Sequence, residues 1–497
     1  MTIGLTESNA QTRPPKPIAS TTTRLEKSGK VFGVLGLYRL CVICRSGERS
    51  GNWRRRRMLR IAQFGLALML LACVAADWPD FLPNTRSRDV SESLPVTWAP
   101  DQNVAWGAEL PGDGQSSPVV WGSRVVVTAV EGDMKDRNLV ICLDTATGQE
   151  LWKQAFDSSF KVKSSLYVSR AAPTPIADAD GIVALFESGD LVALDWQGKV
   201  RWQRSLIQEY GEIRAEFGLA ASLAQAGNVA FALIENLGPS YLVAIDKATG
   251  KSLWKVDRKS VISWSSPAVM TLAGIPQLII SSVGTVDSYD LAAGKLLWTI
   301  GDLGGNTVAS PSQVDANRLI IGAAPGRGEA DSGAASLSNL LINVTAADSA
   351  VRAEVLWRAD KAMASFSTPI AYRGIGYWVN RAGVVFAVDL QDGKQLFAER
   401  IDQSPWATAI GAGDRVYFFG KDGVTTVIRA GLTFEKIASN RLWDPDPPAD
   451  DPAAREETPE RRVAAAMFSG PIQYGVAVAG DGLLIRTGNR LYRVAAN

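Results

Sequence analysis

The feature of this sequence that most constrains its fold is a strand–turn–strand unit that recurs along the chain. The clearest copy is Tyr241–Trp254, in which an apolar run predicts a buried strand and Asp246–Gly250 predicts a tight turn. Gly250 is free to take the positive φ that such a turn requires. A second predicted strand then ends in a large aromatic residue. Four further copies are Cys142–Trp152, Ala193–Trp202, Ser288–Trp298 and Ala387–Phe397.

Each full unit also contains an opening strand and an apolar second strand. The openings begin with a small residue, often Ser or Thr before Pro, at Ser117-Pro118, Thr174-Pro175, Ala221-Ser222, Ser266-Pro267, Ser310-Pro311, Thr368-Pro369, Ala407-Thr408 and Gly470-Pro471. The matching aromatic ends are Trp106, Trp152, Trp202, Trp254, Trp298, Trp357, Phe397 and Phe434. Short, evenly spaced strands with a period of about 40–60 residues are typical of four-stranded propeller blades. The sequence therefore predicts an all-β fold, an eight-bladed β-propeller over residues 104–497.

The two ends of this array predict how the propeller closes. The last segment, Phe468–Asn497, lacks an aromatic closing strand, whereas Val104–Leu110 is a predicted strand with no partners of its own. We expect this N-terminal strand to join the last blade, because pairing removes the free edges that an open sheet exposes.

Two units depart from the pattern. The fifth carries a Gly/Ser-rich insertion at Gly326–Ser336 and lacks the Asp-x-x-x-Gly turn, and the seventh has Arg429–Gly431 in its place. Between the seventh and eighth units, Asp444–Arg462 is rich in proline and charge, which predicts a solvated loop. We expect either insertion to be a recognition loop or a neutral surface insertion.

The repeated residues are interpreted as structural. Each aromatic end is expected to fill the interface between blades, each glycine to permit its turn, and each aspartate to accept backbone N–H groups within that turn. The carboxylates lie on different blades, so they are not expected to converge on one calcium ion. The turn residues concerned are Gly148, Gly198, Gly250, Gly294 and Gly393, with Asp144, Asp195, Asp246, Asp290 and Asp389.

Composition excludes several kinds of chemistry. The 497 residues include no histidine, which rules out a Ser-His-Asp triad, a His-ligated zinc or haem, and a His general base. Residues 1–76 carry 13 Lys and Arg against 3 Asp and Glu, whereas the remainder carries 39 against 48. The part predicted to fold is therefore mildly acidic, which argues against a nucleic-acid partner.

The N-terminus predicts export. Four arginines precede Met58, and the apolar run Ile61–Ala76 ends in small residues, as in a secretory signal peptide over residues 58–76. Cleavage after Ala76 would make Asp77 the first residue of the mature chain. The alternatives are lipidation at Cys73 or an uncleaved anchor, and only these alternatives predict contact with the membrane. Residues 1–57 are interpreted as an unstructured leader or an over-extended start, and residues 77–103 as an irregular extension. The Cys41-Val-Ile-Cys44 pair precedes Arg45 rather than the His of a haem attachment motif, and is interpreted as accidental.

The units A-[IL]-D-x-x-x-G-K-x-x-W resemble the tryptophan-docking repeat of the pyrroloquinoline-quinone-type eight-bladed propellers. The resemblance covers about residues 100–497, and Ala244-Ile-Asp246 with Gly250-Lys251 and Trp254 matches it best. The extension Trp78–Phe81 and Ser116–Pro118 look like exported quinone-propeller-like proteins of planctomycete-type bacteria. The resemblance is specific for fold and weak for activity, because related propellers are both quinone dehydrogenases and non-enzymatic proteins. The latter include the propeller lipoprotein of the outer-membrane barrel-assembly machinery, a scaffold.

Two functions follow from this resemblance. Dehydrogenases of the family carry adjacent cysteines, a calcium site and a catalytic Asp, yet a chain starting at Asp77 has only Cys142 and no stretch that matches the calcium ligands. We therefore expect a periplasmic or envelope binding or scaffold protein, with an envelope protein as partner and no assigned catalytic, cofactor or metal residue. The alternative is a pyrroloquinoline-quinone-dependent oxidoreductase that lacks the cysteine pair; the quinone is implied by resemblance only.

Overall fold

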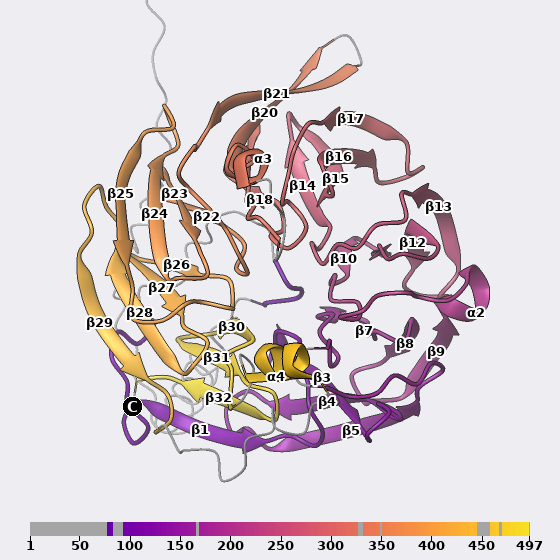
Figure 1. Ribbon diagram of the computed structural model, residues 1–497. Helices are drawn as coiled ribbons and strands as arrows, with labels where there is room; N and C mark the ends of the chain where they lie inside the picture. The colour runs from indigo at the N-terminus through magenta and orange to yellow at the C-terminus, as the bar shows by residue number, and fades with distance from the viewer. Residues whose placement is uncertain are drawn as a thin grey trace, which may run out of the picture. The chain divides into compact units, whose positions relative to one another are not determined.

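The structure is a β-propeller. The computed structural model describes residues 77–82, 93–165, 168–326, 332–347, 350–444, 458–466 and 470–496. In this part of the chain, eight antiparallel sheets of four strands each are arranged in a ring, with very little helix (Figure 1). The predicted all-β, eight-bladed fold is confirmed.

The first four blades follow the chain from the inside of the ring outward. Blade 1 contains β2 (Val119–Trp121), β3 (Arg124–Glu131), β4 (Arg137–Asp144) and β5 (Glu150–Asp157). Blade 2 contains β6 (Ile176–Asp178), β7 (Gly181–Leu185), β8 (Asp190–Leu194) and β9 (Val200–Ser205). Blade 3 contains β10 (Ala224–Ala226), β11 (Val229–Ile234), β12 (Ser240–Asp246) and β13 (Ser252–Arg258). Blade 4 contains β14 (Ala268–Leu272), β15 (Ile275–Ser282), β16 (Thr285–Asp290) and β17 (Leu296–Ile300).

The remaining blades repeat this order until the last. Blade 5 contains β18 (Ser312–Gln313), β19 (Arg318–Ile321), β20 (Leu340–Ala347) and β21 (Ala350–Arg358). Blade 6 contains β22 (Ile370–Tyr372), β23 (Ile375–Val379), β24 (Val384–Asp389) and β25 (Gln395–Arg400). Blade 7 contains β26 (Ile410–Ala412), β27 (Arg415–Phe419), β28 (Val424–Arg429) and β29 (Lys436–Arg441). Blade 8 contains β30 (Gly475–Ala479), β31 (Gly482–Arg486), β32 (Arg490–Val494) and β1 (Val104–Glu109).

Strand β1 comes from the other end of the chain to lie beside β32. The two strands are antiparallel, with Trp106 opposite Arg493 and Gly107 opposite Tyr492. The sheet of blade 8 thus reaches four strands by combining residues more than 380 positions apart in the sequence.

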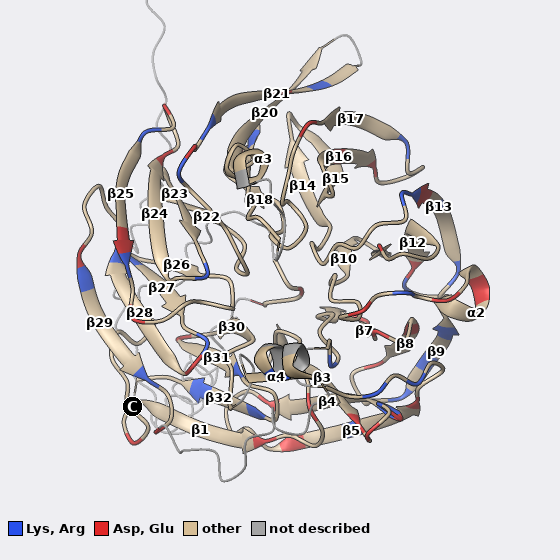
Figure 2. Cartoon of the chain, in the orientation of Figure 1, with Lys and Arg blue, Asp and Glu red and all other residues tan. Residues whose placement is uncertain are grey.

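Burial differs between the inner and outer strands of a blade. In β3, six consecutive residues are buried, as expected for a strand covered on both faces by neighbouring blades. The outermost strand β13 instead alternates between exposed and partly buried residues. Arginines lie along the outer strand β9, and charged residues of both signs lie along β13 (Figure 2). The core therefore consists of apolar layers between adjacent blades.

Part of the predicted loop before blade 8 is helical. Helix α4 (Pro459–Ala466) begins within the segment expected to be a solvated loop, while residues 445–457 lie outside the described part. Proline is favoured at the first helical position and alanine has the highest helix propensity, so PERRVAAA forms a short helix despite its charge. Helix α3 (Ser332–Ser336) occupies the end of the predicted fifth-unit insertion, and α2 (Leu206–Tyr210) follows β9. Among the described residues, no helix has the length and apolar character needed to cross a bilayer.

Candidate binding face of the propeller

The two faces of the ring differ in what they carry. On one face, the innermost strand of each blade begins and the loop between the second and third strands lies. We call this the loop face. The Asp-Gly turns between the third and fourth strands lie on the opposite face, which we call the turn face.

On the loop face, hydroxyl side chains link six successive blades around the centre of the ring. The backbone N–H of Ser117 donates to Thr174 Oγ1 at 2.9 Å, and Thr174 N–H donates to Ser222 Oγ at 3.0 Å. The same bond follows from Ser222 to Ser266, from Ser266 to Ser310 and from Ser310 to Thr368. All six residues are at most 5% exposed. The opening Ser or Thr of blades 2 to 6 is thus an inter-blade hydrogen-bond acceptor.

Aromatic side chains stand two residues before this hydroxyl position in several blades. Phe366 of blade 6 stacks on Trp406 of blade 7, with ring centroids 4.6 Å apart and an interplanar angle of 16°. Trp406 also meets the edge of Tyr474 at 6.1 Å, and Trp264 of blade 4 lies 6.0 Å from Phe217. Partly buried aromatic rings with exposed edges are common at recognition surfaces, because they bury a large area at little conformational cost.

A charged cluster extends from these aromatics across blades 8, 1 and 2. Arg170 donates from Nη2 to the Tyr474 hydroxyl at 3.2 Å, and its Nη1 lies 3.3 Å from Asp113 Oδ2. Arg170 is 6% exposed, whereas the Asp113 side chain is half exposed. Beside it, Lys135 Nζ lies 3.2 Å from Glu187 Oε1, and both side chains are buried. Trp406, Tyr474, Arg170 and Asp113 therefore form one connected group on the loop face.

Backbone conformation is unusual at the same place. Lys135 and Ala171 have φ values of 49° and 48°, in the left-handed region that residues with a Cβ seldom occupy. The Ala171 N–H donates to Glu187 Oε2 at 2.9 Å, and the same carboxylate is paired with the Lys135 side chain. Such positions persist where the surroundings over-determine them, often at functional sites.

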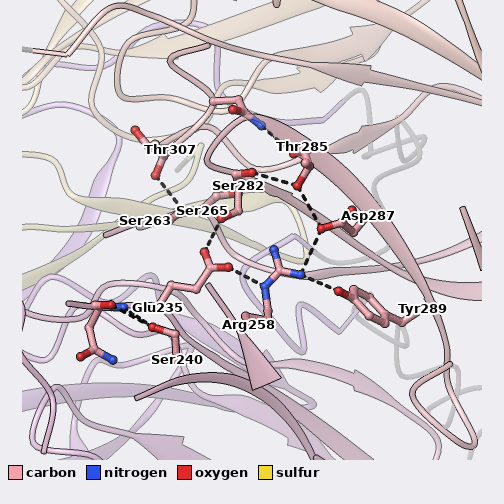
Figure 3. Close-up of polar contacts among 12 residues, drawn as sticks. Glu235, Ser240, Arg258, Ser263, Ser265, Ser282, Thr285, Asp287, Tyr289 and Thr307 are labelled. Carbon is pink, nitrogen blue, oxygen red and sulfur yellow. Dashed lines mark hydrogen bonds and ion pairs between the residues drawn. The ribbon is translucent and has the colours of Figure 1, made fainter. Parts of the chain in front are cut away.

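A second polar network on the loop face joins blades 3 and 4 (Figure 3). Arg258 Nε lies 2.6 Å from Glu235 Oε1, and Nη1 lies 3.1 Å from Asp287 Oδ2. Nη1 also donates to the Tyr289 hydroxyl at 2.6 Å, while the Ser282 hydroxyl donates to Glu235. The carboxylate of Glu235 is 1% exposed and Arg258 is 9% exposed. Because each group is engaged by another, this network is suited to holding blades together rather than to binding.

Burial and charge shift several pKa values in the propeller. Burial lowers the pKa of Arg486 to about 9, although the negative charge of Asp113 acts in the opposite direction. The Nη1 atom of Arg486 donates to the neutral Ser116 hydroxyl at 3.1 Å. Burial disfavours the charge of Arg258, but Glu235 and its neighbours raise the net pKa above the ordinary value. Burial raises the pKa of Cys142 to about 12, so that its thiol stays protonated and is a poor nucleophile at neutral pH.

The repeat residues predicted from the sequence meet in pairs across blade boundaries on the turn face. Trp202 of blade 2 donates from Nε1 to Lys247 O at 2.8 Å and packs on Gly250 of blade 3, where an added Cβ would lie 2.7 Å from the ring. Gly250 has a φ of 73°. The glycine thus allows the positive φ of the turn, and its lack of a Cβ lets the indole ring pack against it. The same pairing occurs for Trp106–Gly148, Trp152–Gly198, Trp254–Gly294 and Trp357–Gly393.

The repeated aspartates accept hydrogen bonds within their own turns. Asp246 Oδ1 accepts from the Thr249 N–H at 2.7 Å and from the Thr249 hydroxyl at 2.8 Å. The hydrogen bond from the Thr249 side chain is the largest of the contacts that lower the pKa of Asp246. Asp144, Asp195, Asp290 and Asp389 each accept from the backbone N–H two residues further on.

Three aromatic ends differ from the pattern. Trp298 donates to Gln277 Oε1 of its own blade at 2.8 Å, because blade 5 has no Asp-Gly turn to receive it. Phe397 meets Phe434 with centroids 5.7 Å apart. Phe434 was expected to close the seventh unit, but it lies before β29. Ala438 takes the position opposite Val427, where blades 1 to 6 have Trp or Phe. Phe434 instead provides the surface on which Phe397 packs.

The sequence of residues 95–233 and 238–431 matches the protein family described as outer membrane protein assembly factor BamB. The chain belongs to this family. No curated protein matches the chain by sequence.

Solved structures of this family and of quinone enzymes share the fold. BamB from Moraxella catarrhalis has a TM-score of 0.52 and 14% identity, with 78% of this chain and 96% of that chain covered. A quinohemoprotein alcohol dehydrogenase from Comamonas testosteroni has a TM-score of 0.53 and 12% identity, covering 88% and 84%. Another, from Pseudomonas putida HK5, has a TM-score of 0.51 and 11% identity, covering 84% and 80%. At these identities, the likeness concerns the fold alone.

The side chains of this BamB-family member do not fit a quinone-associated calcium site on the loop face. Calcium takes six to eight oxygen ligands, often from several carboxylates. Among the described residues, no three Cys, Asp or Glu side chains are grouped to hold a metal ion. The loop-face carboxylates Asp113 and Glu187 are instead paired with Arg170 and Lys135.

Sequence reasoning missed the residues of the loop-face cluster. Asp113 and Arg170 each lie four residues before the opening hydroxyl of their unit, and Lys135 and Glu187 each lie between the second and third strands. The residue type differs from unit to unit at these positions, so no repeated pattern marks them. The hydroxyl positions were visible as Ser/Thr-Pro openings, although their inter-blade role was not.

Proposed function

We propose that the protein is an exported β-propeller that acts as a binding or scaffold protein in the cell envelope. Membership in the family of an outer membrane protein assembly factor carries this proposal. The loop face supplies a fitting surface: Phe366 stacks on Trp406, which contacts Tyr474. Tyr474 in turn contacts buried Arg170, whose partner Asp113 is half exposed. Apolar anchors flanked by charge are typical of protein-binding patches.

A site-specific crosslinking experiment tests this surface. A photoreactive phenylalanine analogue at Phe366 is expected to capture a defined envelope protein in intact cells, identified by mass spectrometry. Leu253 on β13 is the matched control, because it is 53% exposed and lies on the outside of the ring. Equal capture from both positions, or none from Phe366, would contradict the assignment of the loop face.

The competing function is quinone-dependent oxidation, favoured only by the likeness in fold to quinohemoprotein dehydrogenases. Purified protein with added pyrroloquinoline quinone, calcium, an artificial electron acceptor and a panel of alcohols and sugars is expected to show no turnover above that of boiled protein. The reasons are that the described residues contain no grouped metal-binding side chains and that a chain starting at Asp77 has one cysteine, Cys142. Turnover that depends on the quinone would overturn the scaffold proposal.

Export is a further part of this proposal. Residues 1–76, including the predicted signal peptide and Cys73, lie outside the described residues. N-terminal sequencing of protein from the native host is expected to begin at Asp77, because small residues at Val74–Ala76 suit signal peptidase. A mature chain that retains residues 1–57 would contradict export by this signal, and a lipid on Cys73 would indicate membrane attachment.

A further inference from the structure

A short segment, Asp77–Leu82, runs inside the ring; it is extended over Asp77–Pro79 and bends at Asp80–Leu82. Trp78 and Val120 of β2 exchange two backbone hydrogen bonds, each of 2.8 Å. The Ala177 N–H of β6 then donates to Pro79 O, also at 2.8 Å. Both β2 and β6 are terminal strands of their sheets, and the indigo segment lies near the middle of the ring in Figure 1. The segment therefore pairs with the inner edges of two successive blades.

Blade 3 holds the same segment through a side chain whose orientation is set by its neighbours. Gln225 of β10 donates from Nε2 to Pro79 O at 3.2 Å and to Ala177 O at 3.0 Å. Its Oε1 accepts from Lys247 Nζ at 2.9 Å, and Lys247 is also paired with Asp178. Lysine can only donate, so the amide oxygen must face it and the amide nitrogen must face the segment. Lys247 is 4% exposed, so this arrangement is built into the boundary between blades 2 and 3.

The side chains of the segment enter apolar surroundings. Trp78 packs against the apolar clusters on both sides of blade 8. Further along, Phe81 and Leu82 form one wall of a small cavity of about 60 Å³, whose other walls include Leu223, Pro267 and Val269. Pro79 needs no partner for a backbone N–H, so its carbonyl alone has to be recognised.

We propose that the inner edges of β2, β6 and β10 form a binding site for an extended peptide with an aromatic–proline pair, and that residues 77–82 occupy this site in cis. Strand addition at a sheet edge is a general mode of peptide recognition, in which backbone bonds give affinity and side-chain pockets give specificity. The site lies toward the turn face, where Gly122 donates to Asp77 Oδ1 at 2.8 Å. It is therefore separate from the loop face and does not depend on the partner proposed there.

Release of the segment is the basis of the test. A tethered occupant competes at high effective concentration, so a free peptide should bind weakly to the unmodified chain. In a Trp78→Ala variant, a fluorescent peptide of sequence DWPDFL is expected to bind at least about tenfold more tightly, measured by anisotropy. A Leu253→Ala variant should behave as the unmodified chain, and a peptide with Ala in place of Trp should bind neither protein.

A second variant covers the case in which Trp78→Ala does not fold. Phe81 is only partly buried, and Phe81→Ala is expected to give a smaller gain in peptide affinity in a chain with unchanged circular dichroism. In the unmodified chain, hydrogen exchange at the Val120 and Ala177 amides is expected to be slow, and Phe81→Ala should accelerate it. Equal peptide affinity for all chains, no binding to either variant, or fast exchange at both amides in the unmodified chain would each overturn the proposal.

Discussion

Replacing Arg258 with alanine is expected to lower the free energy of unfolding by about 3–5 kcal/mol, because it leaves buried carboxylates without their counter-charge. Glu235 is 1% exposed and the Asp287 side chain is 12% exposed, and both contact the guanidinium. Denaturant melts of the two proteins measure the difference.

The matched control is Arg490→Ala. Arg490 pairs with Glu109 at 2.6 Å, but both side chains are well exposed, so the loss is expected to stay below about 1 kcal/mol. A Glu235→Ala/Arg258→Ala double variant should lose less than the sum of the single losses, since the two residues are directly coupled. Equal losses for Arg258→Ala and Arg490→Ala would refute the role of the buried network in joining blades 3 and 4.

Trp254→Ala is expected to cost about 3–5 kcal/mol, the usual range for removing a large aromatic side chain from a packed site. Its ring packs on Gly294 of the next blade, and its Nε1 donates to Leu291 O at 3.0 Å. The substitution therefore opens a cavity at the boundary of blades 3 and 4. Denaturant melts again provide the measurement.

Two neighbouring substitutions make this result specific. Asp246→Ala should cost only about 0.5–1.5 kcal/mol, since it removes turn hydrogen bonds at a partly exposed site. Leu253→Ala, beside Trp254 but 53% exposed, should change stability by no more than about 0.5 kcal/mol. If Asp246→Ala cost more than Trp254→Ala, the structural interpretation of both residues would be wrong.

The repeat made much of the fold predictable. Every copy of the unit couples an apolar strand, a turn glycine and an aromatic end, so local propensity and side-chain pattern specify the same hairpin. The number of openings then predicted eight blades, which the structure confirms. The prediction was wrong at Phe434. Phe434 lies close in sequence to the position where the closing aromatic was expected, but the pairing of β29 with β28 puts Ala438 at that position.

The loop-face cluster shows why the candidate site was less predictable. Arg170 meets Tyr474 across 304 positions of sequence, and neither residue belongs to a repeated motif. Ring geometry brings them together only after all eight blades have formed. The same holds for Gln225, whose contact with Pro79 spans 146 positions.

The sequence by itself determined the unit, its count and the exclusion of histidine chemistry, because these depend on composition and on contacts between residues close in the chain. Only the tertiary structure decided that each turn glycine receives the tryptophan of the preceding blade, and that opening hydroxyls link six blades. It also placed residues 77–82 along inner strand edges, a position that no local pattern specifies. Such contacts join residues that are distant in sequence and that the ring brings together. They contribute to stability only once the blades are packed.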